Sequence, residues 1–334
     1  MSLMVHSLCK RFPFLKSPAT PLGFETWHDP ISKKGPFYYC VHHKKATLGL
    51  QKKQAHPRRS KLAKAAAAAG EHPDYEEKRL ALTRIKPQTK YDQETIMQDM
   101  VFLQKHRQEK IQKNSPDLTT VLTSYPRFLD WTMPLINSDF EYVCLHYTEK
   151  KQLPDVATVW RNHVPLIISE VLNSESQHQT IRDQLSSLQI SSDEDISSAT
   201  EDILGLAGLI CLPYLMQQKM TPKGATSTCD AAKHLMHIGK KETPVETFTK
   251  DCKCGEQVTQ PVIVALSDEE VKLSACHEFY VVCDLKALPV SGNANRALEL
   301  LYKVFWVFNV DYPAPLSSVY EFLDVIFDMQ VPRV

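Results

Sequence analysis

The stretch at residues 44–64 limits what the chain can fold into more than any other, because it has few side chains that could be buried in a hydrophobic core. Residues 44–64 contain eight Lys and Arg residues, no Asp or Glu, and few large apolar side chains. A run of alanines at 65–69 and then Gly70 follow it. A segment that cannot bury enough apolar surface to offset the entropy of ordering stays unfolded. We therefore predict that residues 44–90 are a basic low-complexity linker without fixed structure.

The linker separates a short N-terminal segment from a part of the chain that has helical patterning. Residues 1–43 mix aromatic and basic side chains, and we interpret them as a small basic and aromatic segment. Beyond the linker, apolar residues recur at roughly helical spacing, which predicts one helix over about 91–112. Further apolar bursts, including a stretch at 203–216 that is apolar nearly all round, predict a helical region over 91–217. Residues 218–260 are polar and are predicted to form a loop.

The last part of the chain, residues 261–334, has mixed patterning and is predicted to be an α/β unit. β-branched and aromatic runs at 261–266 and 279–283 predict two strands that pair with each other. Apolar residues at helical spacing predict helices over 295–308 and 316–327. The predicted fold class is therefore α+β and mostly helical, with a helical middle region and a small C-terminal β-hairpin or sheet packed on helices.

The helix predicted over 295–308 has one strongly apolar face. Leu298, Leu301, Phe305 and Phe308 are separated by three, four and three positions, so they lie on the same side of a helix. We expect this face to pack on the two strands, which would bury all four side chains.

Charge, apolar content and cysteine content indicate where such a chain resides. Residues 1–115 hold 22 basic and 10 acidic residues, whereas residues 116–334 hold 17 and 29, so the two parts have opposite charge. The basic part favours an acidic partner, or the chain's own acidic part. The longest apolar stretch is shorter than the roughly 20 residues that a membrane helix needs. Nine cysteines without regular spacing are typical of reduced thiols. We expect an intracellular protein of the cytoplasm or nucleus, with no membrane partner.

Two cysteines, Cys252 and Cys254, suggest metal binding at first sight. Other residues with suitable side chains lie on both sides of the pair in the sequence: Cys229, His234, His237, Cys276 and His277. Structural zinc sites usually contain cysteines separated by two to four residues, and here one residue separates the pair. We therefore predict no metal and no cofactor. A second cluster, at 40–43, is interpreted as a basic surface loop, because no nearby carboxylate orients its histidines.

The basic stretch at 44–64 has three interpretations. The simplest is a solvated linker. A nuclear localisation signal is the second, and direct contact with nucleic-acid phosphates is the third. No aromatic residues are interleaved for base stacking within the stretch. The residues that would make either nuclear-signal or nucleic-acid contacts are Lys52, Lys53, Arg58, Arg59 and Lys61.

Several motifs make the chain similar to one protein family. The C-terminal motifs are residues 279–283, 297–303, 307–313 and Glu321-Phe322-Leu323; two more, in the middle of the chain, are residues 125–129 and 210–215. Together they resemble the sterile alpha motif domain-containing protein 3-like family over about two thirds of the chain. The sterile alpha motif domain itself has no counterpart in this sequence. The resemblance implies an interaction protein with no catalytic residues and no cofactor.

These observations bear on three classes of function. An enzyme needs titratable groups that converge in a pocket, and none stand at a recognisable spacing here. We therefore expect a non-enzymatic intracellular protein that binds another protein. The alternative is a nuclear nucleic-acid-associated protein that uses the basic stretch at 44–64.

Overall fold

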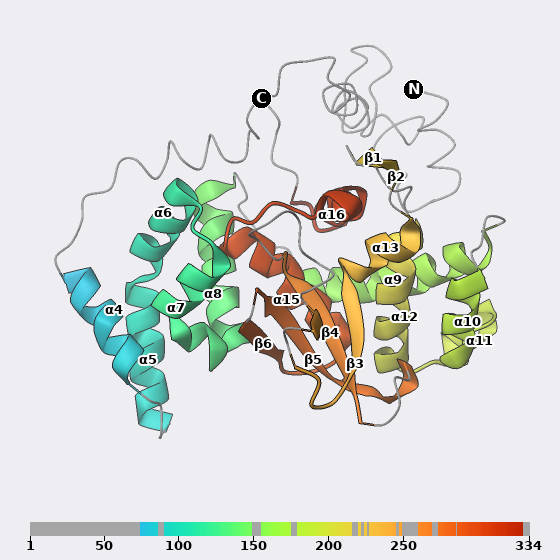
Figure 1. Cartoon of the computed structure of the whole chain (residues 1–334), viewed down its shortest axis with the longest axis horizontal. Coiled ribbons are helices and arrows are strands. Elements are labelled where there is room, and N and C mark those ends of the chain that lie inside the picture. Colours follow the sequence, from blue (N-terminus) through green and yellow to red (C-terminus); the bar gives the residue numbers. More distant parts are fainter. Residues whose placement is uncertain are drawn as a thin grey trace, which may run out of the picture. The chain divides into compact units, whose positions relative to one another are not determined.

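The structure is a computed structural model, and its elements are shown in Figure 1. The residues that it describes are 74–85, 90–148, 155–174, 179–215, 220–221, 224–225, 227–244, 247–248, 260–268, 273–284 and 286–329. All of them belong to one compact unit of the chain, residues 58–334. The predicted N-terminal segment at 1–43 lies outside the described residues.

The first half of the described chain is helical. It contains α4 (Asp74–Arg84), α5 (Lys90–Phe102), α6 (Gln104–Asn114), α7 (Leu118–Ser124), the 3-10 turn η3 (Pro126–Leu129), α8 (Thr132–Tyr147), α9 (Val156–Leu172), α10 (Gln179–Ser187), α11 (Asp193–Ser198) and α12 (Glu201–Leu215). Several of these helices begin at a side-chain cap. Asp117 accepts a hydrogen bond from the backbone N–H of Thr120 at the start of α7, and Asp155 accepts one from Thr158 at the start of α9. Such caps satisfy backbone donors that have no partner within the helix.

Helix α12 is apolar all round because it is enclosed by other helices, as the sequence predicted. Every residue from 205 to 213 in it is buried. Two glycines allow the close approach of its neighbours. A Cβ atom on Gly208 would lie 3.0 Å from the side chain of Val164 in α9, and one on Gly205 would lie 2.6 Å from Asn295 Oδ1. Within the described part of the chain, no helix combines the length and the apolar character that crossing a bilayer requires.

The second half of the described chain contributes a short hairpin, a four-stranded sheet and further helices. Its elements are β1 (Met220–Thr221), β2 (Gly224–Ala225), α13 (Thr228–Lys233), β3 (Met236–Lys240), β4 (Val262–Ser267), η4 (Leu273–Ala275), β5 (Cys276–Cys283), β6 (Lys286–Val290), α15 (Ala294–Val307), η5 (Ala314–Leu316) and α16 (Ser317–Ile326). The sheet order is β3-β4-β5-β6. Strand β3 runs parallel to β4, and the other neighbours are antiparallel. Val264 pairs with Tyr280 in the β4–β5 ladder, so the two predicted strands do pair.

Helix α15 is the centre of the core. Every residue in it except Arg296 is buried, because it contacts β4, β5 and β6 as well as α8, α9 and α12 (Figure 1). The side chains predicted to share one face, Leu298, Leu301, Phe305 and Phe308, are all at most 1% exposed. The fold class predicted from the sequence, a mostly helical α+β protein with a small sheet packed on helices, is confirmed.

The aromatic side chains at the end of α15 face other helical segments. The Phe305 ring packs edge-on against Tyr312 and Tyr320, with centroids 5.3 and 4.8 Å away. The Phe308 ring meets Phe128 of η3 edge-on at 5.4 Å. We expected this face to pack on the strands alone, but its aromatic end packs on helical segments as well. The regions at 91–217 and 261–334 share one core rather than forming separate units.

The predicted linker over 44–90 extends too far. Residues 74–84 form helix α4, which contacts α5 and η3. Leu82 anchors it and is 1% exposed. The sequence does not reveal this helix because α4 is weakly apolar and depends on tertiary contacts for its stability. The remainder of the predicted linker, 44–73 and 86–89, lies outside the described residues.

The loop predicted over 218–260 is also wrong in part, since residues 228–233 form α13 and 236–240 form β3. Strand β3 lies at the edge of the sheet, and only Gly239 in it is buried. It therefore lacks the continuous apolar run that marks a central strand. The edge strand β6 was missed for a related reason, because it contains Pro289, a residue that sheets accept mainly at an edge.

The single helix predicted over 91–112 is two helices. Helix α5 ends at Phe102 and α6 begins at Gln104, with Leu103 between them. At the break, the carbonyl oxygen of Met100 accepts a hydrogen bond from Arg107 Nη1 at 3.1 Å. The apolar spacing continues through the break because Met100, Leu103 and Ile111 are all buried, so spacing alone did not reveal it.

Candidate functional site

The basic residues selected from the sequence, Lys52, Lys53, Arg58, Arg59 and Lys61, lie outside the described residues. So do the second cluster, at 40–43, and the cysteine pair at 252 and 254. The other metal-ligand candidates, Cys229, His234, His237, Cys276 and His277, are described. No group of three or more His, Cys, Asp and Glu side chains that could hold a metal ion occurs among the described residues.

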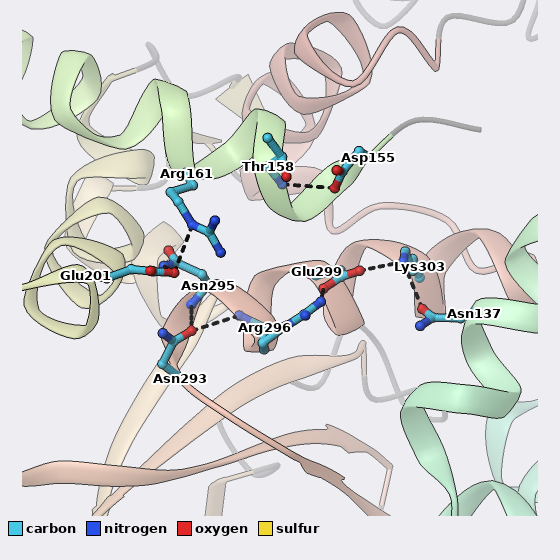
Figure 2. A network of polar contacts seen from close by, with 10 residues as sticks. All are labelled: Asn137, Asp155, Thr158, Arg161, Glu201, Asn293, Asn295, Arg296, Glu299 and Lys303. Atoms are coloured by element: carbon cyan, nitrogen blue, oxygen red, sulfur yellow. Dashed lines mark hydrogen bonds and ion pairs between the residues drawn. The ribbon is translucent and has the colours of Figure 1, made fainter. Parts of the chain in front are cut away.

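A polar network joins α15 to the helices around it (Figure 2). Its centre is Glu299, which is 5% exposed. Glu299 accepts hydrogen bonds of 2.6 Å from Arg296 and from Lys303 Nζ. Lys303 also donates to Asn137 Oδ1 of α8 at 2.8 Å and lies 5.4 Å from the centre of the Phe140 ring. The buried cation and carboxylate of α15 therefore satisfy each other and bind α15 to α8.

The same network continues to α9 and α12 through Asn295. The Asn295 side chain accepts a hydrogen bond from Trp160 Nε1 at 3.0 Å and donates one to Glu201 at 3.4 Å. Glu201 is paired with Arg161 at 2.9 Å, as Figure 2 shows. Hydrogen bonds from Thr158 lower the pKa of Asp155, and the charges of Lys303 and Arg161 act in the same direction. Each polar group named here has a partner, so the network explains how α8, α9, α12 and α15 are held together.

A second buried cluster of polar side chains, centred on Arg107 and Asp139, holds α6 against α8. Arg107 binds Asp139 with two parallel hydrogen bonds of 2.9 and 2.6 Å, and both side chains are 1% exposed. Gln108 and Gln104 donate to the same carboxylate at 2.7 and 3.1 Å. The guanidinium also lies 5.1 Å from the ring centres of Tyr125 and Phe128. This cluster is structural, because it is sealed from solvent and its charges are matched.

Close to this pair, aromatic side chains from four helices gather into what we call the aromatic surface: Tyr75, Phe102, His106, Tyr142, His146 and Tyr147. The Tyr75 ring stacks on His106 at 4.5 Å and meets Phe102 at 5.2 Å. The Tyr142 ring stacks on His146 at 3.9 Å and lies 6.1 Å from Tyr147. The helices that carry these residues contact one another, α4 with α5, α5 with α6 and α8, and α6 with α8 (Figure 1).

Three large apolar side chains on α5 and α8, two of the helices that carry these rings, reach solvent. Phe102 is 43% exposed, its neighbour Val101 is 49% exposed, and Leu145 on α8 is 48% exposed. Lys78 Nζ lies 4.9 Å from the centre of the Phe102 ring. Exposed aromatic and aliphatic side chains that gather in one place on a folded protein mark interaction sites more often than isolated ones do.

The charge of Glu109 on α6 affects two tyrosines of the aromatic surface. Glu109 lies on α6, three residues after His106. Burial raises the pKa of Tyr142, and the negative charge of Glu109 adds to the rise. Burial likewise raises the pKa of Tyr147, with contributions from Tyr142 and Glu109. Among the described residues, Glu109 forms no hydrogen bond and no ion pair.

Sequence reasoning missed the aromatic surface because its members come from separate parts of the chain. Tyr75 falls in the predicted linker, and Phe102 and His106 lie on either side of the helix break. The one local signal is the spacing of Tyr142 and His146, four residues apart, which places their rings on the same side of a helix.

Comparison with known proteins finds no family model that matches this chain, no matching curated protein and no matching solved structure. The family resemblance therefore rests on the sequence motifs alone.

Proposed function

We propose that this chain is a non-enzymatic protein-interaction protein that binds its partner through the aromatic surface. The observation that carries the proposal is the exposure of Phe102, whose ring meets Tyr75, together with that of Val101 and Leu145, which are next in sequence to Phe102 and His146 of the aromatic surface. Aromatic side chains supply large contact areas at low entropic cost, and they are enriched in protein–protein interfaces. The same class of function is implied by the resemblance to sterile alpha motif domain-containing protein 3-like proteins.

Affinity capture with paired variants tests the proposal. The full chain is immobilised, and proteins retained from a cell extract are compared among the wild type, Phe102→Ser and Leu145→Ser. The matched control is Leu166→Ser on α9, because Leu166 is as exposed as Leu145, at 48%. A partner that is retained by the wild type and the control, and lost from both test variants, supports the proposal once it binds as a purified protein.

Two outcomes of this experiment count against the proposal. One is that no protein is retained in a manner that depends on Phe102 or Leu145. The other is that nucleic acid is retained instead, with a steep loss of binding as salt increases. That second outcome would favour the alternative function, which uses the basic stretch at 44–64.

A further inference from the structure

A row of amide side chains runs along the contact between α6 and α8. Gln104, Gln108 and Gln112 stand four residues apart in α6, so they lie on the same side of that helix. Gln104 Nε2 donates to Ser138 Oγ and Asp139 Oδ1 of α8, at 2.8 and 3.1 Å. Gln108 Nε2 donates to Asp139 Oδ2 at 2.7 Å. We call this row of three glutamines the polar seam.

The polar seam contains buried amide atoms that the protein itself does not pair. Gln108 is 0% exposed and Gln112 is 2% exposed. Nε2 and Oε1 of Gln112, and Oε1 of Gln108, have no hydrogen-bond partner in the described part of the chain. Burying an amide atom without a partner is costly, and buried polar atoms of folded proteins nearly always have one. These three atoms therefore indicate a ligand that can pair with them.

We propose that Gln108 and Gln112 bind an ordered water molecule that belongs to the folded structure and stabilises it. The two residues offer one donor, Gln112 Nε2, and two acceptors, the Oε1 atom of each. A single water molecule can accept from the donor and donate to both acceptors, and buried waters typically form about three hydrogen bonds of this kind. This inference does not depend on the proposed function.

Other occupants match these atoms less well. A cation would pair with the two oxygens but not with the Nε2 donor, and the guanidinium of Arg107 already binds the Asp139 carboxylate to which Gln108 donates. An anion would pair with the donor and not with the oxygens. A direct hydrogen bond from Gln112 Nε2 to Gln108 Oε1 would still leave Oε1 of Gln112 unpaired. Water is the ligand that satisfies all three atoms.

Replacing Gln112 by Met tests whether the amide is paired, because Met has a similar helix propensity and no amide. If the amide binds water, the substitution removes hydrogen bonds and should lower the urea midpoint of unfolding by about 0.5 M. If the amide is dry, the substitution removes an unpaired buried group, and the midpoint should rise. The matched control is Gln98→Met, because Gln98 is an exposed glutamine of α5. Its midpoint should change by less than about 0.2 M.

Nuclear magnetic resonance detects the water itself. The full chain is labelled with ¹⁵N-glutamine in a deuterated background, and magnetisation transfer from water to the side-chain amide protons is recorded in the laboratory frame and in the rotating frame. A long-lived bound water gives cross-peaks of opposite sign in the two experiments, whereas proton exchange gives cross-peaks of the same sign. The signals of Gln112 are identified by their loss in Gln112→Met. Gln112→Asn provides the same identification if the methionine variant does not fold.

The inference is supported if Gln112 gives cross-peaks of opposite sign, Gln98 does not, and Gln112→Met lowers the midpoint. A midpoint that rises or stays unchanged in Gln112→Met overturns it, because the amide is then dry or contributes nothing. A lowered midpoint without those cross-peaks also overturns it, because the two amides then pair directly. Neither result bears on partner binding, which the Phe102 and Leu145 variants test separately.

Discussion

Replacing Asp139 by Asn removes the charge that balances Arg107, and the structure indicates how large the consequence is. Asp139 accepts four side-chain hydrogen bonds, two from Arg107, one from Gln104 and one from Gln108. An asparagine offers one oxygen and presents an NH₂ group to donors. The guanidinium is 1% exposed, so no solvent compensates it. Breaking a buried ion pair from one side costs about 3–5 kcal/mol, against about 5–15 kcal/mol for the stability of a whole domain.

Equilibrium unfolding in urea measures this loss. With a slope of about 3 kcal/mol per molar urea, a loss of about 4 kcal/mol lowers the midpoint by about 1.3 M. The control is Asp130→Asn, because Asp130 pairs with Arg127 at 2.9 Å while its side chain is 37% exposed. We expect that variant to lose less than about 1 kcal/mol. Equal losses in the two variants, or a loss below about 1 kcal/mol for Asp139→Asn, would refute the reasoning.

A double variant tests the cause of the loss. Arg107→Met combined with Asp139→Leu leaves no buried charge, so it should be more stable than Asp139→Asn alone. The recovery is expected to be incomplete because Gln108 loses the acceptor of its 2.7 Å hydrogen bond. A double variant that is less stable than Asp139→Asn would show that packing, rather than the unbalanced charge, determines the loss.

Three further predictions concern the core, one histidine and the cysteine pair. Phe305→Ala should cost about 3–5 kcal/mol and lower the thermal midpoint by about 10 °C, because Phe305 is fully buried; an unchanged midpoint would contradict its place in the core. Burial lowers the pKa of His234, with Asp230 opposing the shift, so the unfolded chain binds its proton first as the pH falls. Stability should therefore decrease below about pH 6.5, and His234→Leu should gain stability relative to the wild type between about pH 7.5 and about pH 5.5; a pH-independent difference would argue against this. Elemental analysis should find no stoichiometric zinc, whereas one zinc per chain that disappears in the Cys252→Ser and Cys254→Ser double variant would overturn the sequence prediction.

The sequence alone determined the elements whose signals are local. The strands predicted at 261–266 and 279–283 correspond to most of β4 and to the second half of β5, because each is a run of β-branched and aromatic residues. The apolar face of α15 was predicted because Leu298, Leu301, Phe305 and Phe308 repeat at helical spacing. In each case the residues that form the buried face of the element also produce the apolar spacing in the sequence, so the sequence is enough to predict the element.

Tertiary structure decided the features that depend on residues from distant parts of the chain. Strand β3 pairs with β4, and α4 contacts α5 and η3 and contains the buried Leu82, so both elements depend on parts of the chain that are distant in sequence. The burial of Arg107 depends on a carboxylate 32 residues away, so nothing within α6 distinguishes it from a surface arginine.

The aromatic surface is the clearest example of a feature that the sequence alone does not reveal. Tyr75, Phe102 and Tyr142 lie on three helices, and their rings come together only when α4, α5, α6 and α8 pack. The sequence shows only that these aromatic residues are present. The folded chain brings rings from separate helices into contact, such as Tyr75 with Phe102 and His106, because contact depends on distances through space rather than along the chain.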